Sequence, residues 1–264
     1  MKLNAVLVTG ASSGIGQALA IACAARGRTL HLSGRDSVRL AETARACVAA
    51  GASVRTEVLD VADQIAMQNW IEGCGPLDLV LACAGVSGGP GPVTTDRAAQ
   101  EDPRQIRRIL AVNLDGVLNT VLPAIATMEN QKREDGVRGR IVAIASVAGS
   151  LSSPKAPTYC ASKAAVDRWM VATGANFAPA GIMMSSVCCG FVRSRMTAAN
   201  DFPMPGLMDA DRAALLILRG IAAGRRRIVF PWWMMAGTRM MDLLPLRLTE
   251  AILARQPGKS ATGS

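Results

Sequence analysis

The chain has 264 residues and a net charge of +9, and half of its residues are hydrophobic although only 3% are aromatic. This length suits one α/β domain, and no linker divides residues 1–255, so we expect a single domain there. The basic residues are scattered without interleaved aromatic residues, which argues against a nucleic-acid-binding protein. The seven cysteines include no C-x-x-C pair, so we expect reduced thiols and no metal site. The sequence shows no charged-then-apolar leader, so we expect a cytoplasmic protein.

The chain begins with an apolar strand-like run at residues 3–9, followed by a turn rich in Gly and Ser and by a helical pattern. Gly10, Gly14 and Gly16 let the backbone turn sharply and let a pyrophosphate approach the amides at the start of the helix. The same turn also fits G-x-S-x-G, the nucleophile elbow of hydrolases. That alternative requires a late histidine as base, and the only histidine is His31. We therefore favour the phosphate-binding interpretation.

Strands and helices alternate through the rest of the chain. We expect strands over residues 29–33, 53–59, 77–82, 140–146, 183–188 and 227–230. We expect helices over residues 37–50, 62–72, 104–131 and 210–223, and a further helix around Tyr159. This alternation predicts a doubly wound parallel sheet of seven strands with helices on both faces, a Rossmann fold.

The second predicted strand ends in Ser33-Gly34-Arg35-Asp36. In doubly wound folds the residue at this tip contacts the adenosine ribose, where a carboxylate favours NAD and an arginine can pair with the 2′-phosphate of NADP. Gly34 has no carboxylate, so Arg35 favours NADP. The alternative is that Arg35 is a solvated loop charge that Asp36 partly neutralises.

A group of residues suited to acid/base chemistry begins at the end of the fifth predicted strand. Ser146 lies at the carboxyl end of this strand, where doubly wound sheets bind their ligands. Tyr159 and Lys163 stand four residues apart, on one face of a helix. A phenol ordinarily titrates near 10, and a neighbouring cation lowers its pKa toward the working range. Tyr159 is therefore a candidate general acid/base.

In combination, these motifs resemble the short-chain dehydrogenase/reductase family over nearly the whole chain. The resemblance implies that Ser146 binds the substrate oxygen, Tyr159 transfers the proton, Lys163 binds the nicotinamide ribose and lowers the tyrosine pKa, and Asn113 holds a water of the proton relay. Without this resemblance Asn113 would be interpreted as a solvated or capping residue, as an asparagine within a helix usually is. The cofactor residues that the resemblance implies are Gly10, Ser12, Ser13, Gly14, Ile15, Gly16, Arg35, Asp60, Val61, Ala84, Gly85, Tyr159, Lys163, Gly190, Val192 and Ser194.

Two segments depart from the family pattern. The usual Asn-Asn-Ala-Gly after the fourth strand is Ala82-Cys83-Ala84-Gly85, and the usual Pro-Gly-x-x-x-Thr after the sixth strand begins with Cys189 and ends with Ser194. The first change removes amides that brace the sheet, and the second removes the rigidity of proline. The four catalytic positions keep the residues of the family.

Substrate specificity is expected in residues 193–211, a Met-rich lid. The Trp- and Met-rich helical segment 232–255 is expected to pack on the substrate side or on a partner subunit, and we favour this over membrane contact through residues 225–247. Residues 256–264 are expected to form a disordered tail. Together, these features predict an NADP-preferring enzyme that interconverts a ketone and a secondary alcohol and acts as a reductase on an apolar or lipid-like compound. The enzyme is expected to form a homodimer or homotetramer. The alternative is a catalytically silent nucleotide-binding regulatory or scaffold protein of the same fold.

Overall fold

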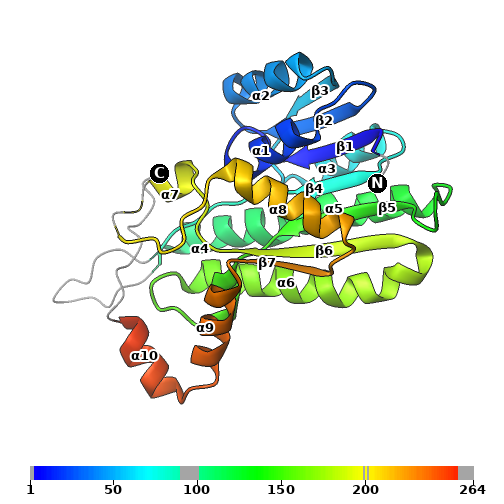
Figure 1. Cartoon of the computed structure of the whole chain (residues 1–264). Coiled ribbons are helices and arrows are strands. Elements are labelled where there is room, and N and C mark those ends of the chain that lie inside the picture. Colours follow the sequence, from blue (N-terminus) through cyan, green and yellow to red (C-terminus); the bar gives the residue numbers. More distant parts are fainter. Residues whose placement is uncertain (1–2, 90–100, 199, 201, 255–264) are drawn as a thin grey trace.

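The computed structural model describes residues 3–89, 101–198, 200 and 202–254. Seven parallel strands form one sheet in the order β3-β2-β1-β4-β5-β6-β7. The strands are β1 (Ala5–Thr9), β2 (Thr29–Gly34), β3 (Ser53–Val58), β4 (Leu79–Ala82), β5 (Gly139–Ile144), β6 (Ile182–Cys189) and β7 (Arg227–Phe230). The predicted doubly wound sheet is confirmed, with helices on both of its faces (Figure 1).

The helices follow the predicted alternation with strands. They are α1 (Gly14–Cys23), α2 (Ser37–Ala49), α3 (Gln64–Glu72), α4 (Pro103–Leu110), α5 (Gly116–Glu129), α6 (Pro157–Phe177), α7 (Arg195–Ala198), α8 (Ala210–Ala222), α9 (Trp232–Asp242) and α10 (Leu246–Ala254), with the short helical turns η1 (Ala111–Asp115), η2 (Val147–Ser150) and η3 (Ala178–Ala180). Asp36 and Asp63 cap α2 and α3 by accepting the amide hydrogens of Arg39 and Ala66.

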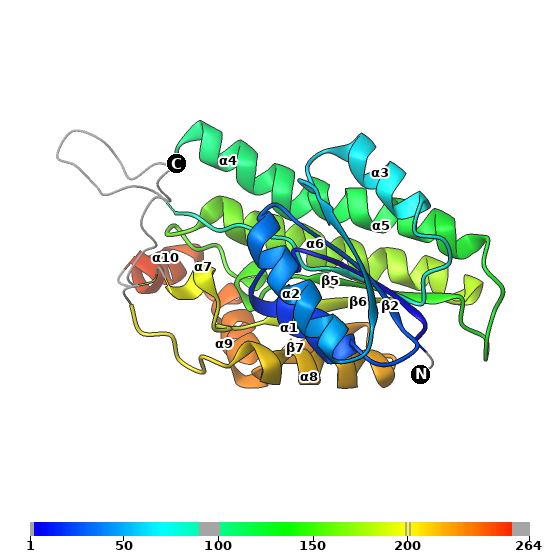
Figure 2. The same cartoon turned by 90° about the horizontal axis from the view of Figure 1, so that it is seen from above.

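The sheet separates two apolar cores. Successive side chains of a strand point to opposite faces, so Val6 and Val8 of β1 join one core whereas Leu7 joins the other. The first core lies under α1, α2 and α8, and the second lies under α3, α5 and α6. The view from above shows these two helix layers on either side of the strands (Figure 2). Because both faces are covered, β1 and β4 are nearly continuous apolar runs.

The long helix predicted over residues 104–131 is interrupted. α4 ends at Leu110, the five residues of η1 form a π-helix, and α5 continues from Gly116. By length and composition alone the stretch Pro103–Glu129 could cross a membrane, but half of its most apolar window is buried. A buried core helix meets the same criterion, and α5 contributes to the second core.

The segments expected to cover the site differ in how far they are described. Within the predicted lid 193–211, residues 199 and 201 lie outside the described residues, as does the predicted tail 256–264. The lid contains α7, and a parallel bridge joins Val192 to Met208. Two helices, α9 and α10, occupy residues 232–254.

Candidate active site

The glycine turn between β1 and α1 packs against the loop after β4. Gly10 and Gly14 adopt positive φ angles of 65° and 57°, which favour glycine. A Cβ added to Gly10 would lie 2.8 Å from the backbone of Ala84, and one on Gly16 would lie 2.3 Å from the Gly10 oxygen. Thr9 Oγ1 accepts a hydrogen bond from the Cys83 amide. This contact braces the loop where the family's amides are missing.

Two other segments border this turn. A Cβ on Gly34 would lie 3.0 Å from Ser12 Oγ, so the tip of β2 lies against the turn. A Cβ on Gly14 would lie 3.1 Å from Ser194 Cβ, which places the segment after β6 beside the start of α1. Residues from three predicted cofactor motifs thus meet at one edge of the sheet, at the carboxyl ends of its strands.

The charges at the tip of β2 differ from the expected arrangement. Arg35 does not pair with Asp36, whose carboxylate lies 2.9 Å from Arg39 instead. Arg35 Nη1 lies 3.7 Å from Asp60 Oδ2, and Arg108 Nη2 of α4 lies 3.7 Å from the same oxygen. Two guanidinium groups therefore flank one carboxylate. Sequence reasoning did not identify Arg108, because only the fold brings α4 to this edge.

Asp60 and Val61 are held in place by α5. Asn119 Nδ2 donates to the Val61 oxygen at 2.9 Å. A Cβ on Gly116 would lie 2.5 Å from Val61 Cγ2, so the helix packs closely against this turn. The Asp60 carboxylate also accepts the Ala62 amide hydrogen at 3.1 Å. These contacts fix the segment that the resemblance assigns to the adenine.

Asn113 lies in the π-helix η1 and is fully buried, so it is neither solvated nor a helix cap. Its Nδ2 donates to the Val86 oxygen and to Ser162 Oγ, and its Oδ1 accepts from the Val86 amide at 2.8 Å. Single π-helical turns occur frequently at functional sites. Here the side-chain amide of Asn113 links Val86, in the loop after β4, to Ser162 of α6.

Lys163 is buried beside the same loop. Its Nζ donates to the Ile144 oxygen at 2.7 Å, at the carboxyl end of β5. A Cβ on Gly85 would lie 3.5 Å from this Nζ and 3.3 Å from Asn113 Oδ1, so Gly85 separates the two side chains. Burial lowers the pKa of Lys163 to about 8, opposed by the neighbouring Cys189 thiol. The ammonium form still predominates at neutral pH.

Tyr159 and Ser146 face one another across the end of β5. Lys163 Nζ lies 6.0 Å from the centroid of the Tyr159 ring. Ser146 Oγ donates to the Cys189 oxygen at 3.3 Å and accepts the Ala148 amide hydrogen, which fixes the hydroxyl at the start of η2. Burial raises the pKa of Tyr159 above its usual value, and the hydrogen bond with Ser146 opposes this. The sequence predicted a lowered pKa; in the chain by itself, burial is the largest influence and raises it.

The segment after β6 completes this edge. The Gly190 amide donates to the Phe230 oxygen at 2.8 Å. A Cβ on Gly190 would lie 2.9 Å from Pro231 Cδ and 3.0 Å from Met234 Sδ, so α9 begins against this glycine. Ser194 lies close to Thr197 in the lid, where its amide donates to Thr197 Oγ1 at 2.9 Å. Gly190, Val192 and Ser194 therefore run from the sheet toward the glycine turn.

A buried carboxylate at the first turn of α6 was not predicted. Glu101 is only 4% exposed, and its Oε2 accepts hydrogen bonds from the amide and the hydroxyl of Thr158 in the first turn of α6. Its Oε1 is buried and has no hydrogen-bond partner among the described residues. Nothing in the local sequence marks this glutamate, because its contact with α6 spans a large separation in the chain.

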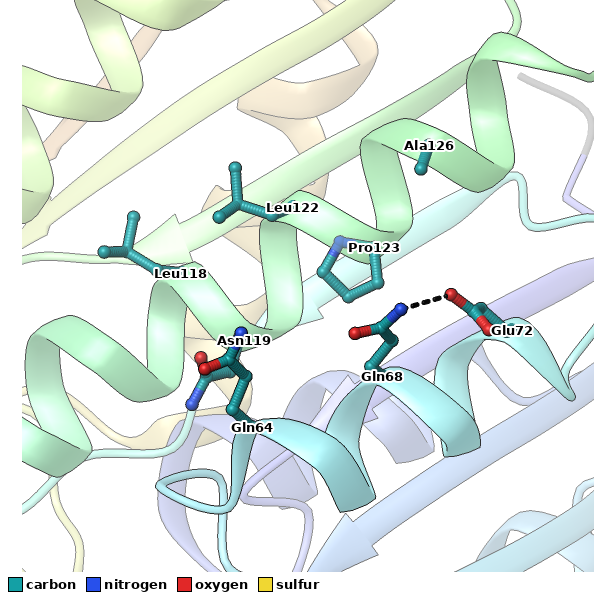
Figure 3. Close-up of a pocket in the computed structure, with 8 residues that line it drawn as sticks. All are labelled: Gln64, Gln68, Glu72, Leu118, Asn119, Leu122, Pro123 and Ala126. Atoms are coloured by element: carbon teal, nitrogen blue, oxygen red, sulfur yellow. Dashed lines mark hydrogen bonds between the residues drawn. The ribbon is translucent and has the colours of Figure 1, made fainter.

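Two surface cavities lie away from these residues. One of about 230 Å³ lies between α3 and α5, lined by Gln64, Gln68, Glu72, Leu118, Asn119, Leu122, Pro123 and Ala126 (Figure 3). The other, of about 400 Å³, lies between η2, α6 and α9. Neither is lined by Ser146, Tyr159 or Lys163. Within the described part of the chain, no cluster of His, Cys, Asp or Glu could hold a metal ion.

Comparison with known proteins identifies the same family as the sequence motifs. The family model described as short chain dehydrogenase matches residues 4–202. An uncharacterized oxidoreductase of Myxococcus xanthus is 34% identical over 97% of this chain and 98% of its own length. A Streptomyces virginiae protein named as a ketoacyl reductase of the monensin polyketide synthase is 33% identical over 72% of this chain and 71% of its length.

Solved structures share the fold. A short-chain dehydrogenase/reductase from Burkholderia phymatum in complex with NAD has a TM-score of 0.78 at 25% identity and covers 99% of both chains. A short-chain dehydrogenase from Sphingobium yanoikuyae in complex with NADPH has a TM-score of 0.76 at 25% identity, covering 92% of this chain and 97% of its own. Proteins of this architecture thus include both NAD and NADPH complexes.

Proposed function

The chain belongs to the short-chain dehydrogenase/reductase family of oxidoreductases, and we propose that it is an NADP-preferring enzyme that reduces an apolar or lipid-like ketone to a secondary alcohol. The convergence of Ser146, Tyr159 and Lys163 at the end of β5 carries this proposal. The serine is hydrogen-bonded to the phenol, and the ammonium lies 6.0 Å from the ring centroid. This arrangement supports proton transfer from the phenol to a carbonyl oxygen bound beside the serine.

In the proposed reaction Ser146 Oγ turns its proton from the Cys189 oxygen to the substrate oxygen and holds the substrate beside Tyr159. The Tyr159 hydroxyl then gives its proton to this oxygen. Its raised pKa keeps the phenol protonated at neutral pH but makes it a weaker acid, so the nearby Lys163 ammonium has to stabilise the phenolate that forms. Bound NADPH supplies the hydride that the carbonyl carbon receives, so that one hydride and one proton convert the ketone to the alcohol.

Lys163 and Asn113 support this proton transfer. The Lys163 ammonium binds the nicotinamide ribose and stabilises the phenolate that the transfer leaves behind. Asn113 holds Val86 and Ser162, and so it fixes the loop after β4 against α6. The proton returns to Tyr159 through a relay that includes a water near Asn113. Positioning of this kind is the protein's main contribution to hydride-transfer chemistry.

The cofactor residues fit a dinucleotide. The glycine turn brings backbone amides to the start of α1, where a pyrophosphate would lie, with Ser12, Ser13 and Ile15 around it. Asp60 and Val61 would contact the adenine. Ala84 and Gly85 would lie along the nicotinamide half, since Gly85 adjoins the Lys163 ammonium. Three residues after β6 would hold the carboxamide or pyrophosphate: Gly190, Val192 and Ser194.

Charge at the tip of β2 supports NADP. Arg35 and Arg108 share the single carboxylate of Asp60, which leaves one positive charge in excess. Half of each arginine side chain is exposed, so both guanidinium groups can turn toward a 2′-phosphate. Gly34 offers no carboxylate to bind the 2′-hydroxyl of NAD.

An apolar substrate is supported by the cover beside the site. Phe191 and Phe202 meet edge to face, with ring centroids 6.2 Å apart, and the exposed Met196 lies in the same segment. Methionine-rich covers adapt to irregular apolar ligands. We further propose a homodimer or homotetramer acting in the cytoplasm, which suits the seven free cysteines.

The experiment that tests the proposed function is NADPH consumption across a panel of apolar ketones, ketoacyl esters and sugars. Turnover of apolar ketones above the sugars is expected. If no carbonyl compound is reduced by the correctly folded protein while NADPH still binds, the chain is a nucleotide-binding protein without this activity.

A further inference from the structure

The last two helices form a projection that the catalytic site does not require. We call α9, α10 and the turn between them, residues 232–254, the C-terminal hairpin. α9 packs on β7 and η2 through its Met235 and Thr238 side. The hairpin then extends away from the sheet, and its connecting turn lies at the far end (Figure 1).

The outer surface of the C-terminal hairpin is strongly apolar. Half of the large hydrophobic side chains that are exposed in the described residues belong to it. The most exposed are Trp232 at 75%, Met240 at 70%, Leu243 at 86% and Leu246 at 65%. Trp232, Met240 and Leu243 are spaced at intervals that place them on one stripe of a helix. A patch of this kind marks an interaction site.

Basic and acidic side chains both lie on the hairpin that carries this patch. Arg239 and Asp242 lie on α9, Arg247 and Glu250 lie on α10, and all four are exposed. None of the four belongs to an ion pair found among the described residues. The whole chain carries +9, so its field also attracts anionic surfaces.

We propose that the C-terminal hairpin binds the surface of an anionic lipid bilayer. Helices with an exposed apolar face and basic residues lie in the membrane interface, where tryptophan is favoured and where anionic headgroups pair with arginine. The bilayer supplies charge opposite to the +9 of the whole chain.

The binding is peripheral. α9 has 11 residues and α10 has 9, and a spanning helix needs about 20. Leu243 and Leu246 at the hairpin turn enter the headgroup boundary, while Met235 and Thr238 stay against the body of the protein. The site edge of the sheet remains outside the lipid, because α9 lies between that edge and the hairpin turn.

The test uses the full-length protein without substrate, so its outcome does not depend on the proposed reaction. The protein is floated with vesicles of equal parts phosphatidylglycerol and phosphatidylcholine, and with vesicles of phosphatidylcholine alone. We expect flotation with the anionic vesicles, weakened by salt, and a shift of tryptophan emission to shorter wavelength. The emission shift should be lost in a Trp232→Phe, Trp233→Phe double variant.

Matched variants locate the contact. Leu243→Glu should weaken vesicle partitioning about tenfold or more, because it removes one buried apolar side chain and adds a repelled charge. Leu215→Glu on α8, where the leucine is 53% exposed, makes the same change in charge away from the hairpin and should have little effect. Leu243 contributes little to folding because it is 86% exposed.

Three results would overturn the proposal. The wild-type protein fails to float with anionic vesicles; Leu243→Glu and Leu215→Glu weaken flotation equally; or light scattering finds an oligomer that Leu243→Glu dissociates while vesicles remain unbound. The last result would assign the patch to a second copy. The tryptophan shift of the wild-type protein tests the proposal without any hairpin variant.

Discussion

The charge arrangement around Asp60 makes a graded prediction about cofactor preference. The tip of β2 carries two guanidinium groups, from Arg35 and Arg108, against one carboxylate. Arg35→Ala leaves this group of charges neutral, and the double substitution with Arg108→Ala leaves the Asp60 carboxylate alone. A lone carboxylate repels the 2′-phosphate of NADPH but not the 2′-hydroxyl of NADH.

The size of the effect follows from exposure. A hydrogen bond to a charged group contributes about 1.5–3 kcal/mol when it is well shielded, and Arg35 is 51% exposed, so the lower end applies. We expect Arg35→Ala to lower the ratio of kcat/KM for NADPH to that for NADH about tenfold, since about 1.4 kcal/mol corresponds to a factor of ten. The double variant should lower this ratio further, by about a hundredfold in all.

The assay measures initial rates with each nucleotide at a saturating level of one reducible substrate. Arg39→Ala is the matched control, because Arg39 pairs with Asp36 and not with Asp60. This variant should leave the ratio unchanged. A double variant at Arg35 and Arg108 that keeps the wild-type ratio would refute the electrostatic reasoning.

Three further outcomes are expected. Since the pKa of Lys163 is about 8, the Kd for NADPH, measured by fluorescence titration, should rise as pH increases through this value in the wild type but not in Lys163→Arg. Burial raises the pKa of Asp167, but the hydrogen bonds from Arg227 outweigh this and hold the pKa below its usual value. The Asp167–Arg227 pair therefore stabilises the fold above the unfolded pKa of about 3.9, and this stabilisation is lost as pH falls through the folded pKa. Asp167→Asn should therefore cost about 2–3 kcal/mol in urea unfolding at neutral pH, and the difference from wild type should vanish in acid. Glu101→Ala should cost about 1–3 kcal/mol because it leaves the buried Thr158 groups unpaired, whereas Glu101→Gln, which keeps an acceptor, should change the unfolding free energy less.

The fold was predictable because its signals are local. Alternating strands and helices at the lengths of βαβ units permit few topologies, and the parallel sheet follows from the helical crossovers between successive strands. The spacing of Tyr159 and Lys163 is likewise a property of one helix. Their partner Ser146 could be placed because a strand end has a known position in a doubly wound sheet.

The rest depends on contacts between distant segments. A π-helix differs from an α-helix by one residue in one turn, so the apolar pattern over residues 104–131 could not reveal η1 or the burial of Asn113. Arg108 and Glu101 each have their partner on another element. The raised pKa of Tyr159 reflects burial, which the Tyr-Lys spacing does not report.

The central claim is that Tyr159 gives the proton to the reduced carbonyl group, and the Tyr159→Phe variant tests it most directly. The substitution removes only the hydroxyl, so NADPH binding, measured by fluorescence titration, should stay within a few fold of wild type. With the best ketone of the panel, kcat should fall about 10²–10⁴-fold, the range that general acid catalysis supplies. A variant that binds NADPH and retains the wild-type kcat would contradict the mechanism.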